Sequence, residues 1–343
     1  IGLGASGRSE GSRVDPRSVI DDLLEVTVVG SFSWIGYAAR RAVFGWQPPA
    51  PAAMAGLTVV ITGPTSGLGR SAAEAVAALG ARVVLVGRSE ERLAGVRDEL
   101  IERHGEDRFP TVVADMGSLA SVRAAAERIV ASETRLDVLI DNAGAIHQER
   151  TIGPDGIEAM LATLVVGPFT LIGGLMPLLD RTAGSRVIAV TSGGQYAQRL
   201  DLGDLQNAAE PYSGTRAYAR AKRAQVSLIR EWSRRVGPRG VRFDSMHPGW
   251  ADTPGLAESL PTFTKVMSPI LRTPSEGIDT LVWLAAGAGR DAPGGSLWLD
   301  RRPRPFDRVP MTRLSLDDRA RLWAAIVDLS GGPDPARDIE GHH

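Results

Sequence analysis

The 343-residue chain contains no cysteine and only two lysines, Lys222 and Lys265. Without cysteine it can form no disulfide, no thiolate metal site and no cysteine nucleophile. The histidines, at positions 104, 147, 247, 342 and 343, lack ligand spacing, so we expect no metal site. The chain also lacks excess positive charge, because it has 39 Lys and Arg residues and 40 Asp and Glu residues. This balance is unsuited to neutralising phosphates, so we expect no nucleic-acid partner.

The N-terminal region is expected to have two parts. Residues 1–18 begin with a stretch rich in Gly, Ser and Arg and are expected to be a disordered or vector-derived tail. Residues 19–46 are apolar and aromatic, but a helix needs about 20 apolar residues to span a bilayer, and no uncharged run here is that long. They indicate either a helical arm packed on the body or a helix on a membrane surface. A Pro-rich linker follows, so that the arm and the linker together cover residues 19–54.

From residue 55 to residue 300, apolar runs of strand length alternate with segments of helical periodicity. The strands are expected at 57–62, 81–86, 110–114, 136–141, 186–191, 241–246 and 296–299. Strands that are apolar on both faces and separated by helices predict an α/β class, a Rossmann doubly wound parallel sheet of about seven strands flanked by helices. Residues 301–343 are expected to be a C-terminal extension with one helix, in which the Arg-rich segment 301–313 is solvated.

One expected helix has no charged residue from Ala159 to Leu179, which is long enough for a membrane span. It contains two prolines and three glycines, and it lies between two strands of one sheet. We therefore expect a buried helix that also contributes to a subunit interface in a homo-oligomer.

The first expected strand runs into a Gly-rich turn, with the sequence Thr62-Gly63-Pro64-Thr65-Ser66-Gly67-Leu68-Gly69, and then into a helix. Glycines at 63, 67 and 69 would let the backbone turn tightly and approach a pyrophosphate held by the helix N-terminus. Glycine spacing alone also fits an ordinary turn, but the strand before it and the helix after it favour dinucleotide binding.

The second expected strand ends at Gly87-Arg88. In a dinucleotide site, the carboxylate that binds the adenosine ribose lies about 20 residues after the glycines, where this chain has Gly87. An arginine can instead bind a phosphate with two hydrogen bonds. We therefore expect NADP(H) to be preferred over NAD(H), the alternative being that Arg88 is an ordinary surface arginine.

Tyr218 and Lys222 lie four residues apart in an expected helix and so share one face. A nearby ammonium and a nicotinamide positive charge would favour the Tyr218 phenolate, which lets the pair act as acid or base near neutral pH. The lysine is notable because this chain uses arginine almost everywhere else.

Five motifs occur in the order typical of the short-chain dehydrogenase/reductase family. They are the turn Thr62–Gly69, the run Asp141-Asn142-Ala143-Gly144, Ser192, the pair Tyr218 and Lys222, and Pro248-Gly249. The sequence resembles that family over about residues 55–300, and within it the retinol-dehydrogenase-like branch. The resemblance implies that Ser192 orients the substrate, Tyr218 transfers the proton, and Lys222 binds the nicotinamide ribose and lowers the pKa of Tyr218. It also implies cofactor contacts from Gly63, Thr65, Ser66, Gly67, Leu68, Gly69, Asp115, Met116, Asn142, Ala143, Gly144, Pro248, Gly249 and Thr253.

Two features depart from the common family pattern. The interval between Ser192 and Tyr218 is long, so residues 195–216 are expected to form an inserted loop over the substrate pocket. Leu164 stands where the family usually has an Asn whose bent backbone holds a water leading to the catalytic lysine. We expect this apolar residue to weaken the relay and to slow the enzyme.

These observations predict an NADP(H)-dependent oxidoreductase that transfers hydride between the nicotinamide and a small lipophilic alcohol, ketone or aldehyde. A nucleotide-binding sensor or scaffold with weak or lost catalysis is the alternative that Leu164 keeps open. We expect a cytoplasmic protein, peripheral to a membrane if residues 19–46 contact its surface.

Overall fold

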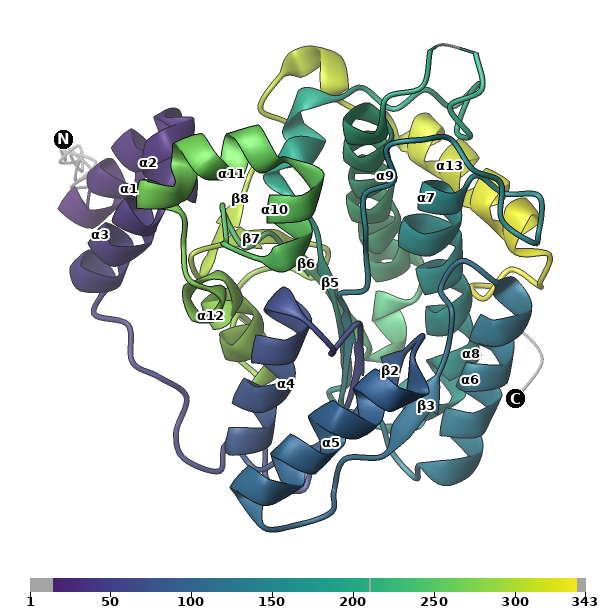
Figure 1. Ribbon diagram of the computed structural model, residues 1–343. Helices are drawn as coiled ribbons and strands as arrows, with labels where there is room; N and C mark the ends of the chain where they lie inside the picture. Colours follow the sequence, from purple (N-terminus) through teal and green to yellow (C-terminus); the bar gives the residue numbers. More distant parts are fainter. Residues whose placement is uncertain (1–14, 210, 338–343) are drawn as a thin grey trace, which may run out of the picture.

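The computed structural model describes residues 15–209 and 211–337. Eight strands form one sheet in the order β3-β2-β1-β4-β5-β6-β7-β8 (Figure 1). Strands β1 to β7 pair in parallel, and β8 pairs antiparallel with β7. Their bounds are β1 Thr58–Thr62, β2 Arg82–Gly87, β3 Thr111–Val113, β4 Val138–Asp141, β5 Arg186–Val190, β6 Arg242–Met246, β7 Leu297–Leu299 and β8 Arg302–Arg304. The predicted α/β class is confirmed, with one strand more than the seven expected.

Helices cover both faces of the sheet (Figure 1). One face carries α4 (Gly67–Ala78), α5 (Glu90–His104) and α12 (Pro274–Ala285), and the other carries α6 (Leu119–Ser132), α8 (Gly167–Arg181), α9 (Gly214–Arg235) and α13 (Leu316–Ser330). The strands supply apolar side chains to both cores, since Val59 packs on the first side and Val60 on the second. This two-sided burial accounts for the continuous apolar runs in the sequence.

The uncharged segment from Ala159 onward is a buried helical run, as expected. It consists of α7 (Ala159–Leu161), a π-helical turn (Ala162–Val166) and α8. The run Ala159–Arg181 is long and apolar enough to cross a membrane, but 72% of its most apolar window is buried inside the protein. Helix α13 of the same chain packs on it, with the Trp323 ring centred 4.9 Å from that of Phe169.

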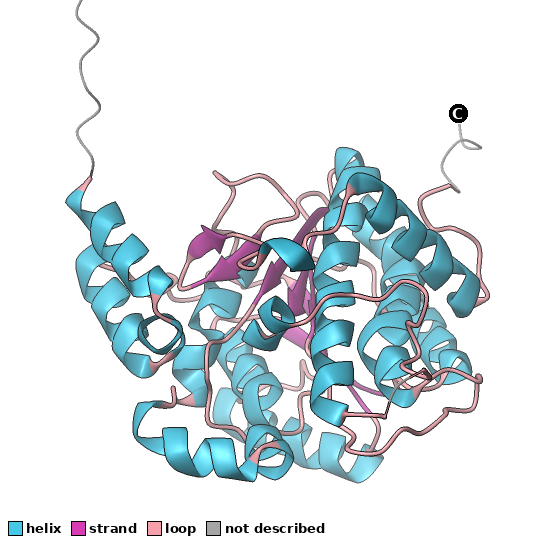
Figure 2. Ribbon diagram, turned by 90° about the horizontal axis from the view of Figure 1, so that it is seen from above, coloured by secondary structure: helices cyan, strands magenta, loops and turns pink. Residues whose placement is uncertain are grey.

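The N-terminal arm consists of three short helices, α1 (Pro16–Val26), α2 (Val28–Phe32) and α3 (Trp34–Phe44). Figures 1 and 2 show the arm at one side of the body. The tail was expected over residues 1–18, but its last three residues belong to helix α1. This helix begins at Pro16, and the Asp15 side chain caps its N-terminus. The rest of that expectation, residues 1–14, lies outside the described residues.

The segment 301–313, expected to be solvated, is exposed only in part. Arg302–Arg304 form β8, and the side chain of Arg304 is 4% exposed. Arg304 and Arg40 both pair with Asp21 of α1, while Arg40 also pairs with Asp300 after β7. The arginines are buried because acidic groups from the arm and the sheet edge neutralise them, which sequence-local hydropathy does not reveal.

Candidate functional site

The Gly-rich turn between β1 and α4 has the shape of a phosphate cradle. Gly63 and Gly67 adopt left-handed conformations, with φ of 68° and 52°. A Cβ atom on Gly69 would lie 2.0 Å from the Gly63 carbonyl oxygen, so no side chain fits there. Ser66 is the N-cap residue of α4 but makes no side-chain capping bond, so the first N–H groups of the helix stay available to a ligand. These residues fit a dinucleotide pyrophosphate. Thr65 lies within the same turn, and Leu68 lies in the first turn of α4.

Asn142 fixes the neighbouring loop after β4 to this turn. Its amide nitrogen donates to the carbonyl oxygens of Thr62 and Gly63, at 3.0 and 3.3 Å. The backbone N–H groups of Asn142 and Ala143 both donate to Thr62 Oγ1 at 2.9 Å. The run Asn142, Ala143 and Gly144 therefore stands beside the cradle, as the family resemblance implies.

The edge that would receive the adenosine lies at the ends of β2 and β3. Gly87 is the last residue of β2, and Arg88 directly after it is exposed. Among the described residues, Arg88 makes no hydrogen bond or salt bridge, so its guanidinium is free for a ligand phosphate. Asp115 is exposed after β3, whereas Met116 is buried beneath it.

The candidate catalytic residues come together from β5 and α9. Ser192 follows β5, and its hydroxyl accepts a hydrogen bond from the Gly194 N–H at 3.2 Å. Tyr218 and Lys222 occupy one face of α9, with the lysine Nζ 5.9 Å from the centre of the tyrosine ring. Thr191 secures the helix, because its hydroxyl donates to the Lys222 carbonyl oxygen at 3.3 Å. This Ser, Tyr and Lys arrangement can carry out acid–base chemistry at a carbonyl or alcohol oxygen.

In the protein alone, the pKa of Tyr218 does not move in the direction that the resemblance implied. Burial raises the pKa of Tyr218 above its ordinary value, and the hydrogen bond with Ser192 opposes this rise. At neutral pH the residue is therefore a phenol, which can donate a proton. Positive charge near the hydroxyl, from the Lys222 ammonium or from a bound oxidised nicotinamide, would lower it.

Lys222 has two polar partners that the sequence did not indicate. Its Nζ donates to the Val190 carbonyl oxygen at 2.8 Å and to Gln225 Oε1 at 3.2 Å. Gln225 Nε2 in turn donates to Asp141 Oδ2 at 2.7 Å. Gln225 and Asp141 lie 84 positions apart in the chain, so only the fold brings this buried network together.

Leu164 lies within the π-helical turn and is fully buried. A Cβ atom on Gly144 would lie 2.8 Å from Leu164 Cδ2, which places the leucine directly against the loop after β4. The helix is thus locally widened at the position where the family has its bent backbone, but the side chain there is apolar.

The loop after β6 lies against the Gly-rich turn. Thr253 caps α10 (Pro254–Ser259), and a Cβ atom on Gly67 would lie 3.3 Å from the Thr253 Cβ atom. Gly249 has φ of 73°, and His247 before Pro248 is fully buried. Burial and nearby arginines hold the pKa of His247 well below its usual range, so the ring is neutral and packs edge-on against Phe32 of the arm.

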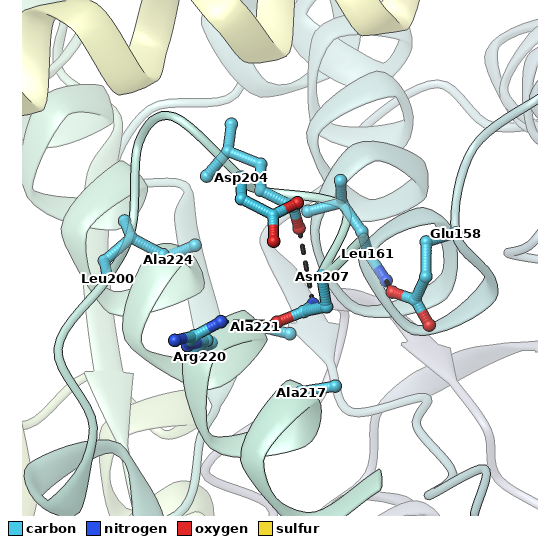
Figure 3. A pocket seen from close by; sticks show the side chains of 10 residues that line it. Glu158, Leu161, Leu200, Asp204, Asn207, Ala217, Arg220, Ala221 and Ala224 are labelled. Atoms are coloured by element: carbon cyan, nitrogen blue, oxygen red, sulfur yellow. Dashed lines mark hydrogen bonds between the residues drawn. The ribbon is translucent and has the colours of Figure 1, made fainter. Parts of the chain in front are cut away.

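The loop expected over residues 195–216 is shorter, because a 3-10 helix covers Gly193–Ala197 and α9 begins at Gly214. Its described residues, 198–209 and 211–213, are held against the body. Tyr212 donates to Glu158 Oε1 at 3.0 Å, and Arg220 of α9 donates to Asn207 Oδ1 at 2.9 Å. Figure 3 shows a small pocket between this loop, α7 and α9, with room for about one water molecule. The expected place of the loop over the substrate pocket stays a prediction.

A phosphate cradle beside a Ser, Tyr and Lys group, all at the carboxyl edge of a doubly wound sheet, defines the class of nicotinamide-dependent oxidoreductases. The short chain dehydrogenase family model matches residues 57–262. The chain belongs to the short-chain dehydrogenase/reductase family and is an NAD(P)-dependent oxidoreductase.

Known proteins show the same relationship. Dehydrogenase/reductase SDR family member 12 from Homo sapiens is 36% identical over 249 residues, which cover 72% of this chain and 78% of that protein. Retinol dehydrogenase 14 from Mus musculus is 34% identical over 268 residues, covering 73% and 79%. A solved structure described as an NAD(P)-dependent gluconate 5-dehydrogenase from Beutenbergia cavernae, with NADP at low occupancy, has a TM-score of 0.59 and 25% identity over 72% of this chain and 96% of that one. The predicted resemblance to the retinol-dehydrogenase-like branch is confirmed.

Proposed function

We propose that this protein transfers hydride between NADP(H) and a small lipophilic alcohol, ketone or aldehyde. The observation that carries the proposal is the position of the Gly-rich cradle and Ser192 at the carboxyl ends of the parallel strands β1 and β5, which both pair with β4, with Tyr218 and Lys222 held against β5. When bound, NADP(H) supplies or accepts the hydride at the substrate carbon. In reduction, the Tyr218 hydroxyl gives its proton to the carbonyl oxygen while Ser192 holds that oxygen. In oxidation, the Tyr218 phenolate takes the hydroxyl proton.

The preference for NADP(H) is supported by the end of β2. Gly87 offers no carboxylate to bind ribose hydroxyls or to repel a 2′-phosphate, and exposed Arg88 offers a positive charge. The relative from Beutenbergia cavernae also holds NADP.

Apolar residues near the site support a lipophilic substrate. Trp250 follows β6 and packs edge-on against Phe263 of α11 (Pro261–Met267), with ring centroids 5.4 Å apart. Trp34 of the arm donates to the Pro269 carbonyl oxygen just after α11 at 3.0 Å. The arm thus contacts the segment that follows α11, and α10 begins directly after Thr253. A relative in this branch is named for retinol, an apolar alcohol.

We further propose that the protein is cytoplasmic and that its arm contacts a membrane surface, which would make it peripheral to that membrane. Most of the exposed large apolar side chains of the described residues lie on the arm: Val19, Ile20, Leu23, Val26, Val28, Val29, Trp34 and Ile35. Exposed apolar patches of this kind mark interaction surfaces. The test is liposome flotation of the full chain, with the Leu23→Asp/Val26→Asp variant, and Leu316→Asp on α13 as control. Equal flotation of the patch variant and the control would reject membrane contact through the arm. The homo-oligomer stays a prediction.

The test of the proposed activity is a cofactor-depletion screen of alcohols and carbonyls with NADPH and with NADH. We expect oxidation or reduction of apolar substrates, faster with NADP(H), and loss of the signal in Tyr218→Phe. Tight cofactor binding without turnover of any substrate would instead support the nucleotide-binding sensor.

A further inference from the structure

Asp141, Gln225 and Lys222 form a buried hydrogen-bonded network in the apolar core beside Tyr218. Their exposed fractions are 2%, 4% and 3%, so water does not satisfy their charges. Asp141 stands at the end of β4, and the other two lie one turn apart on α9. The chain Lys222 Nζ to Gln225 Oε1 and Gln225 Nε2 to Asp141 Oδ2 therefore links the sheet to the catalytic lysine.

The chemistry of the three groups fixes the direction of the Gln225 amide. An ammonium group can only donate, so it requires the carbonyl oxygen of Gln225. A carboxylate can only accept, so it requires the NH₂ group. Gln225 thus satisfies a cation at one end and an anion at the other, which no residue without both functions could do.

The electrostatics of the pair indicate that both end groups are charged at neutral pH. Burial lowers the pKa of Lys222 to about 8, and the Asp141 charge acts against this fall. Burial raises the pKa of Asp141 to about 6, opposed by Lys222 and by the Gln225 hydrogen bond. The groups that face Lys222 are Asp141 from β4, Tyr218 and Gln225 from α9, and the Val190 carbonyl from β5, so Asp141 is the only anion among them.

The second carboxylate oxygen of Asp141 takes no part in this network. Asp141 Oδ1 is buried without a hydrogen-bond partner among the described residues. Leaving a buried carboxylate oxygen unpaired costs stability, so an apolar residue would serve packing better at this position. Leu164, which occupies the family's Asn position, offers Lys222 no polar support.

We propose that Asp141 and Gln225 are positioning residues that hold the Lys222 ammonium in place and keep it protonated during proton transfer at Tyr218. The catalytic step is that of the proposed function, on which this inference rests. The carboxylate offsets the cost of burying the ammonium, and the amide between them fixes where the ammonium lies. A protonated Lys222 then favours the phenolate form of Tyr218.

The two lysines of the chain make the charge of Lys222 directly measurable. In a Lys265→Arg background, protein labelled with ¹³C at lysine Cε gives one lysine side-chain signal, and its shift against pH reports the protonation of Lys222. We expect Asp141→Asn to lower the titration midpoint by about one pH unit or more, a tenfold change in the proton affinity. The Asp141→Asn/Gln225→Glu variant moves the carboxylate from position 141 to position 225, next to Lys222, and should restore the midpoint of the lysine titration.

Ser227→Ala is the matched control, because Ser227 Oγ makes a buried hydrogen bond on the same helix, to the Arg223 carbonyl oxygen, outside this network. An unchanged midpoint in Asp141→Asn, or a double variant no better than the single one, would overturn the proposal. If Asp141→Asn fails to fold, the Gln225→Glu variant tests the proposal by itself. It places a second carboxylate next to Lys222 and should therefore raise the midpoint of the lysine titration.

The pH dependence of kcat gives the second measurement. In Asp141→Asn, the acidic limb of alcohol oxidation should move to higher pH, because a neutral Lys222 no longer favours the phenolate. The double variant should bring it back. If Asp141→Asn shifts the lysine titration but the native protein turns over no substrate, the positioning role stands and the proposed function is rejected. If the native protein turns over substrate and Asp141→Asn leaves the titration unmoved, the proposed function stands and the positioning role is rejected.

Discussion

Asp21 of α1 and Arg304 of β8, 283 positions apart, form a buried salt bridge through both oxygens of the carboxylate and two nitrogens of the guanidinium, at 2.8 and 2.9 Å. The same carboxylate accepts from Arg40 at 2.6 Å. The arm is therefore attached to the edge of the sheet by charge as well as by apolar packing. Removing Asp21 leaves the buried guanidinium groups of Arg304 and Arg40 with fewer acidic partners, namely Glu25 and Asp300, so the cluster loses stability.

We expect Asp21→Ala to lower the free energy of unfolding by about 3–5 kcal/mol, if the arm and the body unfold together. Denaturant titration measures this change, and limited proteolysis shows whether the arm detaches first. Asp22→Ala, at the exposed neighbouring position, is the control and should change the stability little. Equal stability of the two variants would contradict the attachment of the arm through Asp21.

The same carboxylate gives a pH dependence with a definite sign. Arg304 and Arg40 outweigh burial and hold the pKa of Asp21 below its ordinary value. A lowered pKa in the folded state contributes stability above the unfolded-state pKa, and this contribution is lost as the pH falls through the folded-state value. Stability curves of the native chain and Asp21→Asn should therefore converge below about pH 4, and curves that stay parallel down to pH 2 would contradict this.

Arg88 should discriminate between the two nicotinamide cofactors. Because the guanidinium stands exposed at the end of β2 where no carboxylate competes, Arg88→Ala should weaken NADPH binding more than NADH binding. A lost charge-assisted contact with phosphate is worth about 1.5–3 kcal/mol, which is roughly a tenfold or greater loss in affinity. Calorimetry with both cofactors measures it, with exposed Arg92→Ala on α5 as control. Equal losses for the two cofactors would remove Arg88 from the site.

Tyr218→Phe should abolish turnover and leave cofactor affinity nearly unchanged, because only the hydroxyl that transfers the proton is lost. Lys222→Arg should also be severely impaired, since a planar guanidinium cannot replace the compact ammonium among Val190 and Gln225. Tyr37→Phe on α3 removes a distant hydroxyl and is the control for steady-state kinetics. Wild-type turnover in Tyr218→Phe would refute the assigned acid–base role.

The sequence predicted those features that depend on residues close together in the chain. Alternating apolar runs predicted the seven parallel strands within a residue or two, because strands buried on both faces leave a continuous signature. The motifs lie after strands that are parallel neighbours in one sheet, so the expected cofactor and catalytic residues share its carboxyl edge, while their roles stay predictions. The strand Arg302–Arg304 was missed because the acidic partners of its arginines, Asp21 and Glu25, lie on the arm, which is far away in the sequence.

The network around Lys222 was missed for the same reason. Gln225 lies three residues after Lys222, so its presence on the same helix face could have been inferred from spacing. Its partner Asp141 is the first residue of the motif that continues with Asn142, and the sequence gives no sign that its side chain turns into the core. Pairings across the sheet depend on strand order, which no local pattern contains.

Leu164→Asn is the variant for which the structure changes the expectation. From the sequence, an Asn here should restore a polar path to Lys222 and raise turnover. The structure places Leu164 in the core against Gly144, and it shows that Gln225 and Asp141 already support the lysine. Turnover should therefore not rise.

A buried amide without partners costs about 1–3 kcal/mol, so we expect Leu164→Asn to lower the free energy of unfolding by at least that amount. Leu161→Asn, one helical turn earlier and also buried, is the control for a buried amide away from the loop after β4. Denaturant titration and steady-state kinetics across pH on one substrate measure both properties. A stable Leu164→Asn protein with several-fold faster turnover would show that the family's water path can be restored, and that Gln225 and Asp141 do not replace it.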